Sequence, residues 1–184
     1  MRSIQVSSYR LIPLCMARWR ALIAQRPLRA ALELGACLGL LGVLCSIVLS
    51  YVTVSLLPPE LWGRSGAAHL DGLDPLMTFF MMVVFAPLFE TVLGQLLPME
   101  AARRLRAGAG PQVLLSGLVF GYGHYASGGI AHGITACFAG LVFAYAYANL
   151  RPAGMGPAYL AAASAHAMQN GIMWACMMLS IGIF

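Results

Sequence analysis

The sequence predicts an all-α membrane protein, a bundle of about five transmembrane helices whose N-terminus is cytoplasmic. Of its 184 residues, 60% are hydrophobic and only 9% are charged, whereas a soluble domain carries about 25% charged residues. Several apolar runs are long enough to cross a bilayer core about 30 Å thick. The basic residues, all of them arginine, gather at one end of these runs.

The first two spans follow from the positions of charge. Residues 34–57 contain no charged side chain, and residues 76–99 contain only Glu90. Each run is long enough to form one transmembrane helix. The helix formers after Pro98 predict that the second helix continues to about Leu105.

The later spans need a break. Residues 111–150 carry no charge, but they are too many for a single crossing. The Ser-Gly-Gly sequence at 127–129 supplies a turn, so this region is predicted to be a hairpin of two helices. Residues 157–184 give the fifth helix.

The arginines set the orientation. All but Arg64 lie on one side of the predicted spans: Arg2, Arg10, Arg18, Arg20, Arg26, Arg29, Arg103, Arg104, Arg106 and Arg151. Loops rich in arginine stay in the cytoplasm, so this side is predicted to be cytoplasmic. The same placement accounts for the net charge of +5 without a nucleic-acid partner.

We divide the chain into two parts. Residues 1–30 form a basic N-terminal segment, which fits either an amphipathic helix on the anionic inner leaflet or a basic tail without fixed structure. Residues 31–184 form the transmembrane bundle. Within the bundle, glycines four residues apart, as at Gly35 and Gly39, favour close approach of helices.

Five polar side chains lie inside these apolar spans: Glu90, His124, His132, His166 and Asn170. Ionisable groups at membrane depth are costly and mark functional sites. Counted from the cytoplasmic ends, all of them except His132 lie at similar depths of about 14–22 Å. We therefore predict one shared polar site between spans two, three and five. His132 lies nearer the outer surface, where we expect a structural role.

Three motifs resemble those of a known family. APLFETVLGQ (86–95), FGYGH (120–124) and HAMQN (166–170) are similar to the E-E-x-x-x-R, F-x-x-x-H and H-x-x-x-N/D motifs of the CAAX-processing and bacteriocin-processing (CPBP, or Abi) intramembrane proteases. The resemblance covers a motif-bearing core over residues 75–184.

The resemblance implies a glutamate-type peptidase without a cofactor. Glu90 would activate a water for peptide hydrolysis, and His124 would assist it. His166 and Asn170 would stabilise the oxyanion, with Phe120 packing one turn before His124. A positioned carboxylate can accept the proton of water, and fixed donors in a water-poor cavity stabilise a tetrahedral intermediate.

Two positions depart from the family pattern. Thr91 stands where the second Glu is expected, and Gln95 stands where the Arg is expected. Because both charges are absent together, we predict that a neutral hydrogen-bonded pair replaces a structural ion pair. The two residues are assigned a supporting role.

Two alternatives stay open. Glu90, His124 and His166 could bind zinc as two imidazoles and one carboxylate with an open position. The chain could also be a non-catalytic membrane protein of binding or immunity function on a protease-like scaffold.

The expected partners are the lipid bilayer and a membrane-associated, lipidated or secreted peptide or protein. The family includes enzymes that trim prenylated C-termini and enzymes that process secreted peptides or sorting signals, and the sequence does not choose between them. The absence of Lys beside abundant Ala, Gly and Arg is typical of GC-rich bacteria. The expected location is therefore a bacterial inner membrane.

Overall fold

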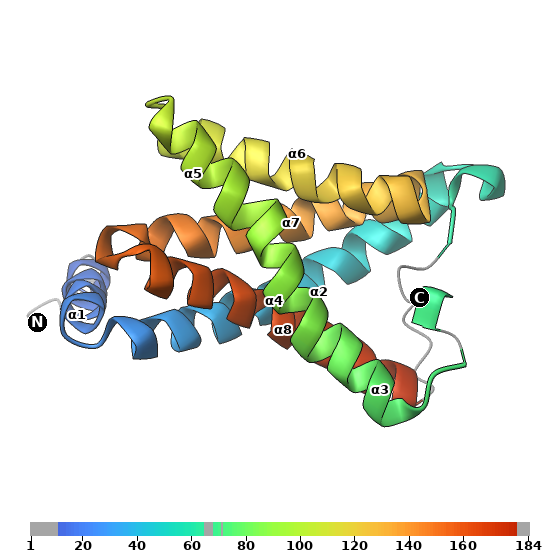
Figure 1. Ribbon diagram of the computed structural model, residues 1–184, viewed down its shortest axis with the longest axis horizontal. Helices are drawn as coiled ribbons and strands as arrows, with labels where there is room; N and C mark the ends of the chain where they lie inside the picture. Colours follow the sequence, from blue (N-terminus) through green and yellow to red (C-terminus); the bar gives the residue numbers. More distant parts are fainter. Residues whose placement is uncertain (1–10, 65–67, 71, 180–184) are drawn as a thin grey trace, which may run out of the picture.

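The computed structural model describes residues 11–64, 68–70 and 72–179, without the side chains of residues 11–16 and 69. Over these residues the chain is all-helical, with no strand, as predicted. Its long helices are α1 (Leu11–Gln25), α2 (Pro27–Leu56), α6 (Ala109–Gly128), α7 (Ile130–Leu150) and α8 (Met155–Met178) (Figure 1). Short 3₁₀ turns lie between them at Pro59–Leu61, Ala68–Leu70 and Arg151–Ala153.

The second predicted span is one helical rod of changing register, which crosses the bundle obliquely in Figure 1. It comprises α3 (Pro75–Phe79), a π-helical segment (Phe80–Phe85), α4 (Ala86–Thr91), a second π-helical segment (Val92–Leu96) and α5 (Leu97–Arg104). The carboxylate of Asp74 caps its start by accepting the N–H groups of Leu76 and Met77, both at 3.0 Å. The rod continues past Pro98 as predicted.

The predicted hairpin is confirmed. α6 ends at Gly128 and α7 begins at Ile130, with Gly129 between them at φ 88°. This left-handed conformation is readily available only to glycine, so the break falls where the sequence predicts it.

Among the residues that the structure describes, three helical stretches are long and apolar enough to cross a membrane: Pro27–Leu56, Pro75–Arg104 and Ile130–Ala153. Their outward faces carry exposed apolar side chains such as Leu44, Val48 and Phe138, as expected of surfaces that contact lipid. The helices α6 and α8 are 20 and 24 residues long, but polar side chains make them less apolar. Their crossing of the bilayer, and hence a total of five spans, stays a prediction.

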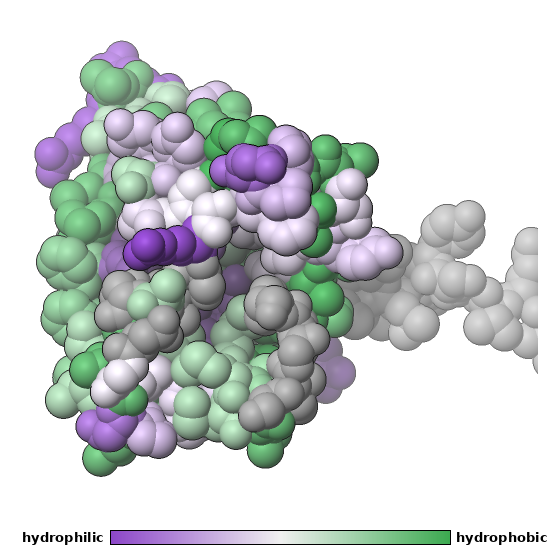
Figure 2. Space-filling view, turned by 90° about the vertical axis from the view of Figure 1, so that its right-hand side faces the viewer, coloured by the Kyte–Doolittle hydropathy of each residue, from purple (hydrophilic) through white to green (hydrophobic). Residues whose placement is uncertain are grey.

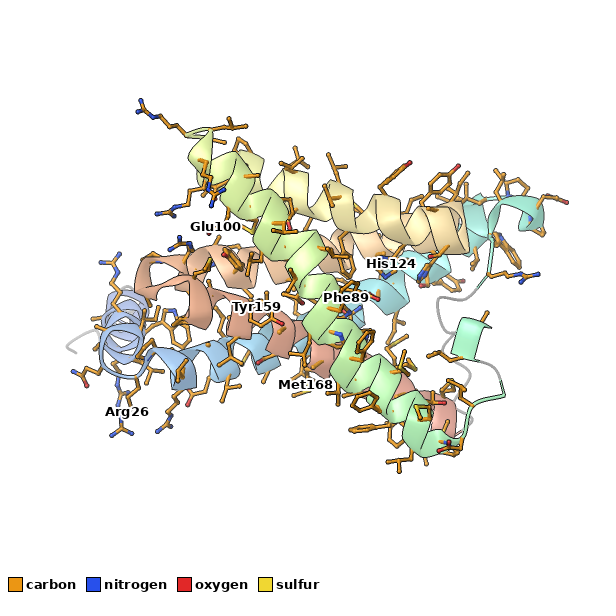
Figure 3. The ribbon with its side chains drawn as sticks, in the orientation of Figure 1. Arg26, Phe89, Glu100, His124, Tyr159 and Met168 are labelled. Atoms are coloured by element: carbon orange, nitrogen blue, oxygen red, sulfur yellow. The ribbon has the colours of Figure 1, made fainter. Side chains whose placement is uncertain are left out.

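The described arginines again divide between the two ends of the bundle. The end on the left of Figure 3, where Arg26 is labelled, contains the starts of α2 and α6 and the ends of α5 and α7. Helix α1 lies across this end (Figure 1) and packs Trp19, Leu22 and Ile23 against the core. A helix in that position supports the interfacial alternative for the N-terminal segment. Arg2 and Arg10 lie outside the described residues.

Small residues bring α2 and α8 into backbone contact. A Cβ at Gly35 would lie 2.8 Å from the carbonyl oxygen of Ala161, and one at Gly39 would lie 2.6 Å from that of Ala165. Alanines of α8, including Ala161 and Ala165, are fully buried in the core. Close packing without side-chain bulk is a common way for membrane helices to associate.

An ion pair ties α5 to the end of α7. Glu100 accepts hydrogen bonds from Arg151 at 2.5 and 2.9 Å and from the hydroxyl of Tyr147 at 2.9 Å. The Tyr147 ring is almost fully buried. Bidentate geometry makes such a pair stronger and more directional than a single contact, so the arginine-rich end of the bundle is held closed.

We predict that Gly39→Ala lowers the free energy of unfolding by about 1–3 kcal/mol, because overpacking forces the backbones of α2 and α8 apart. The matched control is Gly123→Ala, also inside a helix, where an added Cβ meets nothing within 4 Å. Unfolding in a fixed detergent or lipid measures both variants. Equal stability of the two would contradict the close contact between α2 and α8.

Candidate active site

One carboxylate and two imidazoles from three different elements converge inside the bundle. The Oε2 atom of Glu90, on α4, lies 3.6 Å from Nε2 of His124, on α6, and 3.8 Å from Nε2 of His166, on α8. Figure 3 shows His124 beside the part of the rod that carries Phe89, the neighbour of Glu90. The predicted convergence of these three side chains is confirmed.

The register of the rod places Glu90 in a short α-helical segment between two π-helical ones. Segments of π-helix carry one extra residue per turn, and they occur often at functional sites. Side chains of α6 and α8 donate hydrogen bonds to backbone carbonyls of the rod at three points around Glu90.

The first point is Met82. In the π register the N–H of Ala86 donates to the carbonyl of Met81, so the next donor in that register would be residue 87. Pro87 has no N–H, and Nδ2 of Asn170 donates to the Met82 carbonyl instead, at 2.9 Å. Asn170, predicted as an oxyanion donor, therefore uses one amide hydrogen to hold the rod.

The other two points lie on either side of Glu90 in sequence. The Tyr159 hydroxyl of α8 donates to the Leu88 carbonyl at 2.8 Å. The Ser116 hydroxyl of α6 donates to the Gly94 carbonyl at 2.7 Å, an acceptor that Pro98 cannot satisfy in an α-helical register. Neither Tyr159 nor Ser116 was predicted from the sequence. Pro98 was the signal for a partner of the Gly94 carbonyl, whereas no proline follows Leu88 at that spacing.

Hydrogen bonding sets the tautomer of His124. Its Nδ1 lies 2.9 Å from the carbonyl oxygen of Phe120, which can only accept, so Nδ1 carries the proton. In the neutral ring, Nε2 is then a bare acceptor that faces Glu90. The predicted packing of Phe120 against His124 is also found, with ring centroids 4.4 Å apart.

His166 is held by aromatic rings. It stacks on Phe143 at 4.7 Å and meets the edge of Phe120 at 5.4 Å. Its side chain is only 4% exposed, against 24% for His124 and 36% for Glu90. Its Nδ1 has no hydrogen-bond partner among the described residues. The ring thus offers Nε2 alone to the site.

The predicted hydrogen bond between Thr91 and Gln95 was wrong. Both side chains are fully buried, yet the Thr91 hydroxyl and both polar atoms of the Gln95 amide lack a partner within the described part of the chain. The π-helical segment Val92–Leu96 begins directly after Thr91. The changed register removes the α-helical alignment of positions four apart on which the prediction depended.

Two further polar side chains belong to the site. His132, for which we expected a structural role, lines the cavity and lies 5.1 Å from the His124 ring, centroid to centroid. Gln169 also lines the cavity and donates to the Ser46 hydroxyl at 3.0 Å. The position of Gln169 within HAMQN was its only sequence signal.

These groups surround a cavity of about 870 Å³. Glu90, His124, His132, His166 and Asn170 line it together with apolar side chains. Figure 2 looks at the end of the molecule opposite the arginine-rich end and shows hydrophilic residues around a recess near its centre. A carboxylate with two imidazoles in such a cavity can bind and deprotonate a water molecule.

The zinc alternative named Glu90, His124 and His166. Within the described residues, no group of three His, Cys, Asp or Glu side chains is arranged to hold a metal ion. The zinc alternative stays a prediction, and the chemistry proposed for the site uses side chains alone.

The family model described as type II CAAX prenyl endopeptidase Rce1-like matches residues 72–172. That range covers more than half of the chain and contains every residue of the candidate site from Met82 to Asn170. Comparisons with curated proteins and with solved structures gave no significant match.

We predict that Ser116→Ala lowers the free energy of unfolding by about 0.5–1.5 kcal/mol, because it removes a buried hydrogen bond between α6 and the Gly94 carbonyl. Ser127→Ala is the matched control. Its exposed hydroxyl bonds only to carbonyls of its own helix, at Gly123 and His124. Chemical unfolding compares the two variants, and a Ser116→Ala protein as stable as the control would contradict the support we assign to Ser116.

Proposed function

Because this chain belongs to the Rce1-like type II CAAX prenyl endopeptidase family, we propose that it is an intramembrane endopeptidase whose water is activated by Glu90. The family makes it a CAAX-type protease in general terms. The observation that supports the specific chemistry is that two imidazole nitrogens face one carboxylate oxygen, within 4 Å, inside a cavity at membrane depth.

The first step is the attack of water on the peptide carbonyl. A water held between Glu90 and His124 gives its proton to the carboxylate, and its oxygen forms a bond to the carbonyl carbon. The unprotonated Nε2 of His124 accepts a hydrogen bond from the second O–H of that water. This bond orients a lone pair of the water oxygen toward the carbonyl carbon. The π electrons of the carbonyl move to its oxygen, which becomes an oxyanion.

The second step is the collapse of that intermediate. The protonated Glu90 passes its proton to the leaving nitrogen as the C–N bond breaks. A carboxyl can serve first as base and then as acid because it regains its charge with each turnover.

His166 is the proposed main donor to the oxyanion. Its Nε2 faces the Glu90 carboxylate, which favours the tautomer that carries the proton on Nε2. Its Nδ1 is then a bare acceptor within an aromatic and apolar shell. Asn170 has a second amide hydrogen beyond the one bound to Met82 and is proposed to donate it to the oxyanion. Donors fixed before reaction stabilise developing charge strongly.

The proposed substrate is a peptide or protein at the membrane, and the proposed location is a bacterial inner membrane. A non-catalytic binding or immunity role is the alternative. Substitution of Glu90 by Gln separates this role from the protease.

We expect Glu90→Gln to reduce cleavage by at least about 100-fold, since the amide cannot accept the proton of water. The measurement is mass spectrometry of membrane peptides from cells with the active protein and with the variant. The matched control is Glu33→Gln, whose exposed carboxylate pairs with Arg29 outside the site and should leave cleavage unchanged.

Fluorescence-detected size exclusion checks that both variants are inserted and folded. If folded Glu90→Gln retained full cleavage, the proposed base would be wrong. If folded Glu90→Gln kept the full biological activity of the protein but cleaved nothing, the non-catalytic role would replace the protease proposal.

We predict that exhaustive removal of divalent metals leaves cleavage unchanged, because the proposed base is a side chain. Purified protein is dialysed against a zinc chelator, its metal content is measured, and its activity is compared before and after. Loss of activity that added zinc restores would instead favour the zinc alternative.

A further inference from the structure

We propose that the catalytic cavity takes its substrate from the non-cytoplasmic face of the membrane, so that the substrate is a peptide segment of an exported protein. This inference rests on the proposed function and adds the side of access and the substrate class. It starts from the position of the cavity along the bundle.

The cavity occupies only the half of the bundle away from the arginine-rich end. Its lining on α2 begins at Ser46 in a helix that runs from 27 to 56, and on α6 it begins at Phe120 in a helix that runs from 109 to 128. The lining on α8 begins at His166 and continues to Met177, next to the last residue of that helix. By the positive-inside rule, this half is the non-cytoplasmic one.

The connection after α2 forms part of the cavity wall at that end. Trp62, Gly63, Arg64 and Leu70 all line the cavity. Arg64 is also the arginine that the sequence leaves off the cytoplasmic side. The cavity therefore extends to this extracytoplasmic loop, and Figure 2 shows a recess at the same end of the molecule.

Close backbone contact keeps this loop in place. The N–H of Arg64 donates to the Gly128 carbonyl at 2.9 Å. Gly63 has φ 78°, and a Cβ there would lie 1.9 Å from the same carbonyl oxygen. The loop is therefore seated on the turn between α6 and α7, and the mouth is a built feature of the fold.

The opposite side of the cavity is closed by aromatic rings. Phe120 and Phe143 meet edge to face at 5.7 Å, and His166 stacks on Phe143. Phe143 is only 1% exposed, and behind it Tyr147 and Leu150 are 1% and 0% exposed. The ion pair of Glu100 with Arg151 then ties the helices together at the cytoplasmic end. A peptide from the cytoplasm would have to open this packing to reach Glu90.

The lining indicates what enters. Methionine and phenylalanine side chains cover the walls beside the polar site: Met81, Met82, Phe85, Phe89, Met173 and Met177. Flexible methionines fit apolar side chains of varied shape. An extended apolar segment that reaches the mouth from outside, such as one next to a membrane anchor, matches these walls.

The side of access also restricts the source of the substrate. A prenylated CAAX tail anchors a protein that is not exported, so its scissile bond would face the closed end. An exported protein offers its segment at the open end. The reaction that must precede cleavage is therefore translocation of the substrate across the membrane.

The experiment measures access to a single thiol. Thr135→Cys is placed on the cavity wall in a variant whose native cysteines are replaced by Ala, and sealed vesicles of both orientations are treated with a charged, membrane-impermeant maleimide. We expect labelling at least ten times faster from the non-cytoplasmic side. The matched control is Ala109→Cys, exposed at the start of α6, which should be labelled only from the cytoplasmic side.

Faster labelling of the cavity thiol from the cytoplasmic side would overturn the proposal. So would a thiol that only a membrane-permeant maleimide reaches, since access would then be lateral from lipid. Ser50→Cys, on the α2 wall of the same cavity, repeats the measurement if Thr135→Cys does not fold.

Labelling does not require turnover, so the Glu90→Gln protein carrying the same cysteine should be labelled from the same side. An inactive protein with outward access would thus contradict the protease proposal alone. An active protein with inward access would contradict only the substrate class.

Discussion

The fold of this protein is governed by the cost of placing a carboxyl group at membrane depth. Glu90 is tolerable there only where polar groups face it or a cavity can admit water. Two imidazoles face it, and a cavity reaches it from one end of the bundle. The apolar outer faces can then contact lipid without exposing the acid.

Holding Glu90 in that place requires an irregular helix. The π-helical segments on either side of it shift the register of the rod, and the Met82 carbonyl loses its helical donor because Pro87 has no N–H. Asn170, Tyr159 and Ser116 donate hydrogen bonds to carbonyls of the rod. The helices that carry the two imidazoles thus also hold the backbone on either side of Glu90, which couples the geometry of the site to the packing of α6 and α8.

The two ends of the bundle differ for the same reason. At the arginine-rich end, the core is packed by glycine and alanine contacts, buried rings and the ion pair of Glu100 with Arg151. At the other end, polar and flexible side chains leave a hollow. The entry of water and an extended peptide that we propose at this end would leave the close packing of the other end undisturbed.

Several features could be predicted from the sequence alone. They are the helical class, the hairpin at Gly129, the gathering of arginines at one end of the bundle, and the convergence of Glu90, His124 and His166. Each depends on local composition, spacing or depth, which are properties of one helix at a time. Other features became clear only from the folded chain. They are the π-helical register, the lack of a hydrogen bond between Thr91 and Gln95, the hydrogen bond of Asn170 to the Met82 carbonyl, and the position of His132 beside His124. They depend on which atom of a neighbouring helix lies opposite a given carbonyl or ring, and a sequence pattern does not specify the rotation of one helix against another.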